Sequence, residues 1–108
     1  MITFEEFSKV ELVVGTVLEA SEVPGSEKLI KQIVDFGELG KRQILSGIKK
    51  WYTPDVLIGR QFMFIVNLEP RVMLGLESQG MLLAGHGPDG EAVLYTFDST
   101  LPEGNSIS

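Results

Sequence analysis

The sequence has no cysteine and only one histidine among its 108 residues. The absence of cysteine excludes disulfide bridges and thiolate metal ligands. The lone His86 lies in Gly85-His86-Gly87-Pro88, a turn-like segment without the strand-to-helix context of a phosphate loop. It has no second histidine for zinc, and no nucleophile motif accompanies it. We therefore expect no metal site, no cofactor, no catalytic residue and no enzymatic activity.

Long apolar runs are also missing. The longest apolar stretch, near residues 62–66, has the length of a strand and falls far short of the roughly 18 residues needed to span a bilayer. The first six residues carry two acids and no base, unlike a secretory signal. We expect a cytoplasmic protein with no membrane partner. An apolar fraction of 44% and the length of 108 residues predict one globular domain over residues 1–108.

Positive charge is scarce overall but concentrated in the middle of the chain. The formal net charge is −6, which by itself argues against a nucleic-acid partner. Residues 28–60, however, hold seven bases against three acids, whereas residues 61–108 hold six acids and Arg71 as the one base. Two interpretations stay open at this point: ordinary scatter of surface charge, and a basic surface for an anionic partner.

Short segments rich in β-branched residues predict a small all-β barrel. The expected strands are residues 10–23, 29–36, 42–45, 62–67, 81–84 and 91–97, with a short terminal strand after a turn at 102–105. Gly15 predicts a bend or bulge in the first strand. A short helix, capped by Thr53 with Pro54 at its first position, separates the third strand from the fourth. This order is typical of the oligonucleotide-binding (OB) fold, a five-stranded Greek-key barrel, here with extra C-terminal strands.

The N-terminus predicts a further short helix. Thr3 and Glu6 fit a capping box, and Phe4 and Phe7 fall on one helix face, which we expect to close one end of the core.

Other apolar residues also need a place. Trp51 and Tyr52 precede the second helix, and we expect them to seal the barrel end rather than stack on bases. A barrel of this size cannot hold all the large apolar side chains of both terminal regions. This predicts a two-fold apolar interface, formed by the N-terminal segment and the strands after Gly85.

An ordered set of segments resembles the tRNA-binding domain family. The segments are Leu12–Val17, Ser26–Leu29, Val34–Gly37, Ile44–Ile48, Asn67–Gly75 and Ser78–Ala84. The family includes C-terminal and beta-subunit-like domains of methionyl-tRNA synthetases, free-standing tRNA-binding proteins and CsaA-type export chaperones. The Ser46-Gly47 and Asn67-Leu68 segments are closer to the synthetase-associated branch. The resemblance implies an OB-fold homodimer that binds tRNA by shape, with an aminoacyl-tRNA synthetase as a possible partner.

The resemblance and the charge pattern together select the residues expected to contact RNA. They are Lys28, Arg42, Ser46, Lys49, Lys50, Asn67, Arg71, Met73, Ser78 and Met81. The bases would contact phosphates, Ser78 would donate to a phosphate or ribose, and the methionines would offer apolar contacts. For Asn67 the alternative is an Asx turn, for Met81 it is core packing, and for any single lysine it is solvated surface charge.

The chain departs from the family pattern where bases are usual. Glu69, Val72 and Leu74 stand in the loop from Asn67 to Gly75, which we expect to be exposed, and Val13 replaces a commonly basic residue. Fewer phosphate contacts would lower the affinity for RNA. The apolar, acidic loop suits a protein ligand better than a phosphate backbone. The alternative function is therefore a CsaA-like export chaperone, or a protein-interaction or dimerisation module on the same fold.

Overall fold

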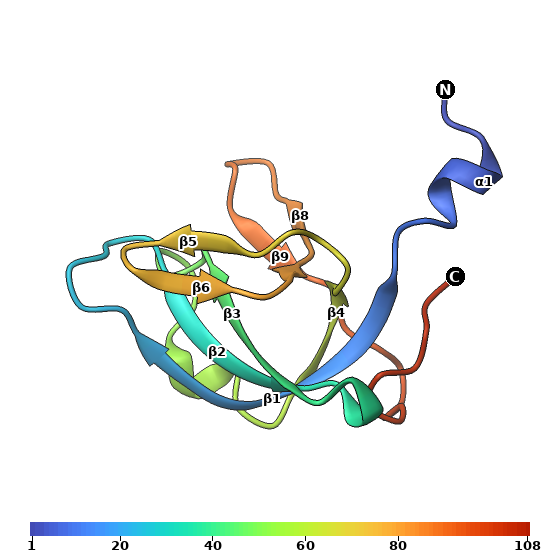
Figure 1. Cartoon of the computed structure of the whole chain (residues 1–108). Coiled ribbons are helices and arrows are strands. Elements are labelled where there is room, and N and C mark those ends of the chain that lie inside the picture. The colour runs from blue at the N-terminus through green and yellow to red at the C-terminus, as the bar shows by residue number, and fades with distance from the viewer.

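Nine short strands and little helix make up the structure, a computed structural model that describes residues 1–108 (Figure 1). The elements are α1 (Phe4–Phe7), β1 (Leu12–Glu22), β2 (Ile30–Asp35), β3 (Lys41–Ser46), β4 (Gln61–Ile65), β5 (Arg71–Met73), β6 (Leu76–Ser78), β7 (Met81–Leu82), β8 (Ala84–His86) and β9 (Ala92–Leu94). Five strands form an antiparallel sheet in the order β3-β2-β1-β4-β7, and β5–β6 and β8–β9 are separate hairpins. The predicted all-β, OB-like architecture is confirmed.

The sheet curls into a nearly closed barrel because the last residue of β6 and the residue after it bond to the free edge of β3. The backbone N–H of Gln79 donates to the carbonyl of Gln43 (2.8 Å). In return, the N–H of Gln43 donates to Gln79 Oε1 (2.9 Å), and the N–H of Leu45 donates to Ser78 Oγ (3.0 Å). Two side-chain oxygens thus stand in for strand carbonyls, and the edge of β3 is covered.

The interior is filled by alternate residues of the strands. The core cluster consists of Val13, Val17, Ile30, Val34, Phe36, Ile44, Ile48, Leu57, Phe62, Phe64, Val66 and Leu94. Gly15 lies where a side chain would collide with it, since a Cβ there would be 2.5 Å from Val34 Cγ1 and 2.6 Å from Phe36 Cε1. The predicted irregularity of β1 falls later, as a register shift between Val17 and Glu19. Gly15 therefore makes room for Phe36 rather than bending the strand.

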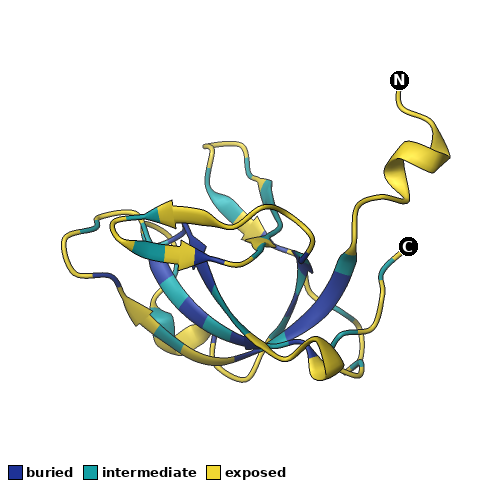
Figure 2. Ribbon diagram, in the orientation of Figure 1, coloured by how far each residue is buried: buried dark blue, intermediate teal, exposed yellow.

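The N-terminal helix has the predicted cap but not the predicted packing. The N–H of Glu6 donates to Thr3 Oγ1 (3.1 Å), and the Glu6 carboxylate accepts from the N–H of Thr3 (3.3 Å). Phe4 is nevertheless 82% exposed, and α1 stands away from the barrel (Figure 2). The expectation that it closes the core is wrong. The C-terminal segment lies along the start of β1 instead, where the N–H of Ile107 donates to the carbonyl of Leu12 (2.8 Å).

The loop predicted for residues 67–75 is in part a hairpin. Strands β5 and β6 pair through Arg71 with Ser78 and Met73 with Leu76. The two residues between them, Leu74 and Gly75, have φ values of 51° and 77°. Positive φ at both central positions is the requirement of a type I′ hairpin turn. Type I′ turns usually have Asn-Gly at these two positions. Because leucine replaces the asparagine here, the sequence pattern predicted a loop and not a hairpin.

Several strands in the C-terminal part of the chain have boundaries that differ from the predicted ones. The strand expected over 81–84 is divided between β7 and β8, and the one expected over 91–97 shortens to β9. The terminal strand is reduced to one bridge, between Val13 and Ser106. None of the helices has the length and hydropathy to cross a bilayer.

The two aromatic residues before the second helix behave differently. Tyr52 packs on the core, and its hydroxyl accepts from the N–H of Leu94 (3.3 Å). Trp51 is 42% exposed, so the expected sealing role is confirmed for Tyr52 and wrong for Trp51. Thr53 precedes a 3₁₀ turn, Pro54–Val56, but its side chain makes no capping hydrogen bond.

Candidate nucleic-acid interface

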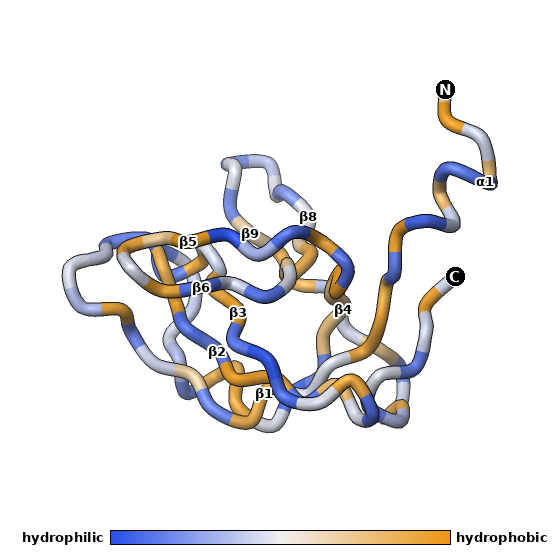
Figure 3. Tube along the Cα trace, in the orientation of Figure 1, coloured by the Kyte–Doolittle hydropathy of each residue, from blue (hydrophilic) through white to orange (hydrophobic).

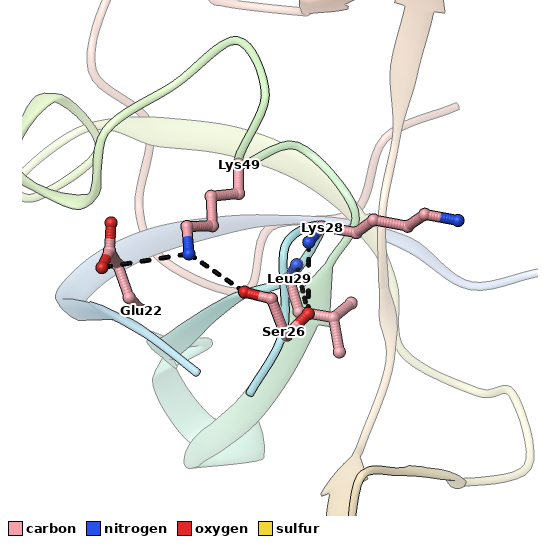
Figure 4. Close-up of polar contacts among 5 residues, drawn as sticks. All are labelled: Glu22, Ser26, Lys28, Leu29 and Lys49. Atoms are coloured by element: carbon pink, nitrogen blue, oxygen red, sulfur yellow. Dashed lines mark hydrogen bonds and ion pairs between the residues drawn. The ribbon is translucent and has the colours of Figure 1, made fainter. Parts of the chain in front are cut away.

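The loop between β1 and β2 is fastened to the segment after β3 (Figure 4). This junction gathers three of the predicted lysines, Lys28, Lys49 and Lys50. Ser26 Oγ accepts from the N–H groups of Lys28 (3.2 Å) and Leu29 (3.0 Å), which shapes the loop. The N–H of Lys49 donates to the carbonyl of Lys28 (3.1 Å), and Lys49 Nζ donates to the carbonyl of Ser26 (3.0 Å). Lys28 and Lys49 are therefore neighbours, and Lys50 follows directly.

Lys28, Lys49 and Lys50 are called the lysine junction below. Their ammonium groups differ in the contacts that they make within the protein. Lys49 Nζ also lies 3.9 Å from a carboxylate oxygen of Glu22, so it is held by the protein. The Lys28 side chain is exposed, extends away from that pair and makes no ion pair or hydrogen bond (Figure 4). Lys50 is exposed as well, with its Nζ 5.7 Å from the centroid of the Trp51 ring. Lys28 and Lys50 are the two whose ammonium groups have no hydrogen bond or carboxylate partner in the protein.

Few of the acidic residues form ion pairs with the basic ones. The chain has 15 acids and nine bases, yet the Lys49–Glu22 contact is its one ion pair. Lys28 and Lys50 therefore present positive charge that has no ion-pair partner in the protein. Such charge is available to an anion from outside.

Three predicted RNA contacts use their polar atoms inside the barrel instead. Arg42 donates from Nη1 to the carbonyl of Val66 (2.6 Å). Ser46 is buried, and its hydroxyl donates to Gln32 Oε1 (3.2 Å). Ser78 is 4% exposed and both accepts from Leu45 and donates to the carbonyl of Gly80 (3.0 Å). The two buried serine hydroxyls leave little or nothing for a ligand, whereas Arg42 is half-buried and its Nη2 and Nε make no hydrogen bond within the protein.

Asn67 takes neither of the two roles considered for it. Its Oδ1 accepts from the N–H of Glu11 (2.8 Å) and its Nδ2 donates to the carbonyl of Lys9, so it ties the N-terminal segment to the end of β4. Val13 is likewise not a lost surface contact, because it lies in the core at 5% exposure.

The remaining predicted residues lie on the β5–β6 hairpin and β7. Arg71 is exposed and pairs in register with Ser78, which bonds to Leu45 on β3. Met73 is half-buried and Met81 is exposed. The hairpin tip itself is apolar (Figure 3), with Val72 and Leu74 at 72% and 63% exposure.

Lys31 is a basic residue of this region that the site prediction left out. It lies on β2 between inward-facing neighbours and pairs with Leu45, on the same rung that leads through Ser78 to Arg71. The alternation of apolar and polar residues along β2 was the signal that could have placed it on the outer face. The chain contains no group of three acidic or histidine side chains arranged to hold a metal ion.

Comparison with known proteins decides which family this barrel represents. Residues 12–106 match the family model described as a putative tRNA binding domain. The chain belongs to this family. The relatives include the methionine–tRNA ligase of Methanothrix thermoacetophila, with 50% identity over 107 residues, 99% of this chain and 16% of that protein. The chain thus spans about one sixth of the length of the curated relatives it matches.

Two solved structures superpose over the whole chain. A MetRS-related protein from Pyrococcus horikoshii is 38% identical with a TM-score of 0.94, covering 100% of this chain and 98% of that one. The chaperone CsaA from Bacillus anthracis is 39% identical with a TM-score of 0.91, covering 100% and 99%. The resemblance to both branches of the family is therefore confirmed, and the fold is common to the two.

Proposed function

We propose that residues 1–108 act as one non-catalytic tRNA-binding unit, associated with an aminoacyl-tRNA synthetase in the cytoplasm. The observation that carries the proposal is the lysine junction, where Lys28 and Lys50 project unpaired ammonium groups from a backbone held by the Lys49–Lys28 and Lys49–Ser26 hydrogen bonds. Family membership and the similarity to methionine–tRNA ligases support tRNA as the anion.

The mode of binding follows from the kind of groups available. Ammonium groups bond to phosphates without reading sequence, so the surface suits a folded RNA recognised by shape. Lys28, Lys50 and Arg71 offer free cations, with Lys31 and Lys49 nearby. The overall charge of −6 then opposes loose association with other parts of the protein surface.

The test is a double substitution, Lys28→Ala with Lys50→Ala, assayed by mobility shift against several tRNAs at two or more salt concentrations. Loss of two phosphate contacts should weaken binding by a similar factor for every tRNA, and should make the slope of log K against log salt shallower by about 2. The matched control is Lys9→Ala, which removes one exposed charge from the N-terminal segment and should leave the slope unchanged. Equal affinity of the double variant and the wild type would place the RNA elsewhere.

A second candidate function is a CsaA-like, peptide-binding role. The observation that favours it is the apolar tip of the β5–β6 hairpin, with Val72 and Leu74 exposed and Glu69 and Glu77 beside them. An acidic apolar surface repels phosphates and suits an unfolded polypeptide. Binding of a fluorescent unfolded peptide, lost in a Val72→Ser, Leu74→Ser variant that still shifts tRNA, would assign this role to the hairpin.

We also propose a homodimer. Phe4, Phe7 and Val10 in the N-terminal segment, and Val93 and Tyr95 around β9, are exposed large apolar residues. Exposed apolar groups in both of these regions supply a surface that a partner could cover. Two copies would bring two lysine junctions to one RNA, which raises the effective affinity without a new contact.

A further inference from the structure

An apolar pocket of about 350 Å³ opens between the segment after β3 and the strands β7 to β9. Ile48, Leu83 and Ala92 are among the residues that line it, and Trp51, Met81 and His86 line it as well. The volume is at the lower end of the range found for small-molecule sites, which suits one planar group. None of the three last-named residues belongs to the buried core.

The pocket offers two side chains suited to a flat, polarizable ligand. Trp51 and Met81 are 42% and 40% exposed. An indole ring supplies a stacking face, and a thioether contacts aromatic groups favourably. Both are apolar groups left open to solvent although Tyr52, next to Trp51 in the chain, packs on the core. Both side chains are therefore available to a ligand from outside.

The charge beside the pocket distinguishes between possible ligands. Lys50 Nζ lies 5.7 Å from the Trp51 ring centroid and has no carboxylate partner. It therefore places a cation without a carboxylate partner over the aromatic ring, next in the chain to Lys49. A nucleotide carries both a flat base and a phosphate within one residue, so it can use the ring and the ammonium together. A peptide side chain would use the apolar wall and leave the cation unpaired.

We propose that this pocket binds one unpaired nucleobase of the structured RNA, stacked on Trp51 and contacted by Met81, while Lys50 bonds to a phosphate next to it. This rests on the proposed RNA-binding function and adds a preference for RNA with unpaired bases. The lysine junction supplies binding that is independent of base pairing, and the pocket supplies the selection of an unstacked base.

Trp51 is the chain's one tryptophan, so its emission reports on the pocket directly. Titration with bulk tRNA should quench or shift this emission. A blunt, fully paired RNA duplex with a similar number of phosphates should change it far less at concentrations where it binds, because its bases are not free to stack.

Two variants separate stacking from charge. Trp51→Leu keeps an apolar side chain without the ring and should weaken tRNA binding by roughly 5- to 150-fold, the range expected for one lost stacking contact. Its salt slope should stay that of the wild type, whereas Lys50→Ala should make the slope shallower. Trp51→Phe keeps a ring and should retain most of the affinity. Because Trp51 is exposed, circular dichroism and the unfolding midpoint should be unchanged in both Trp51 variants.

The outcomes distinguish the pocket from the proposed function. If the wild type binds tRNA but Trp51→Leu binds equally well, or if the paired duplex changes the emission as much as tRNA does, the pocket proposal is overturned and the function stands. If an unfolded peptide changes the emission and tRNA does not, the pocket is a peptide site and the proposal fails. Absence of any tRNA binding would overturn both.

Discussion

Polar side chains in this barrel divide into those that complete the fold and those left in solvent. Arg42, Ser46 and Ser78 satisfy buried backbone or side-chain groups, whereas Lys28 and Lys50 have no such task. A hydroxyl group that is already hydrogen-bonded inside the protein has no hydrogen bond left to offer, so a ligand gains no binding free energy from it. We therefore expect Ser46 and Ser78 to support the proposed RNA interface through the fold rather than by direct contact.

Replacing Ser78 tests this division. Ser78→Ala leaves the buried N–H of Leu45 without an acceptor, which should lower the free energy of unfolding by about 1–3 kcal/mol. The measurement is the midpoint of urea unfolding, with an unchanged m-value. The affinity of the folded variant for tRNA should equal that of the wild type. A loss of affinity at unchanged stability would instead assign Ser78 a direct contact.

Among the elements, the β5–β6 hairpin combines a regular turn with an unsuited residue. Leu74 adopts φ 51°, a conformation that costs a residue with a Cβ roughly 1–2 kcal/mol relative to the right-handed region. Asparagine tolerates this conformation and is favoured at this position of a type I′ turn. Leucine at a position that its backbone disfavours is consistent with a contact made by the Leu74 side chain at the hairpin tip.

Leu74→Asn should therefore stabilise the isolated domain by about 1 kcal/mol, seen as a higher urea midpoint. Leu68→Asn is the matched control, since Leu68 is also exposed but has no positive φ. It should leave the midpoint within about 0.5 kcal/mol of the wild type. A stability gain in both variants would show that solubility rather than turn geometry is responsible.

At the scale of the whole molecule, the N-terminal segment is the part that the barrel does not use. It is joined to the barrel through Asn67, and its aromatic side chains remain outside. A small domain gains little by exposing phenylalanine, so the proposed dimer gives these residues a buried place. The same patch on both chains would form the two-fold interface.

Light scattering over a range of micromolar concentrations tests the proposed two-fold interface. We expect a mass of twice 11.9 kDa for the wild type and of 11.9 kDa for Phe4→Glu, because a buried carboxylate without a partner opposes association. The control is Val72→Glu, at a similarly exposed apolar residue on the hairpin, which should remain dimeric. A monomeric wild type at all concentrations, or a monomeric Val72→Glu variant with a dimeric Phe4→Glu variant, would contradict the interface.

The sequence by itself predicted the barrel, because the order of its short strands is typical of the OB fold and the ordered segments from Leu12 to Ala84 resemble the tRNA-binding domain family. It also predicted the capping box of Thr3 and Glu6, which depends on neighbours close in the chain. It also located the lysines at 28, 49 and 50. The tertiary structure alone decided that α1 stays outside the core, that Leu74 and Gly75 close a hairpin, and that Ser46, Asn67 and Ser78 bond inwards. Their partners, such as Gln32, Glu11 and Leu45, are 14 to 56 residues away. Which distant backbone group meets a side chain depends on how the barrel closes, and no local pattern records it.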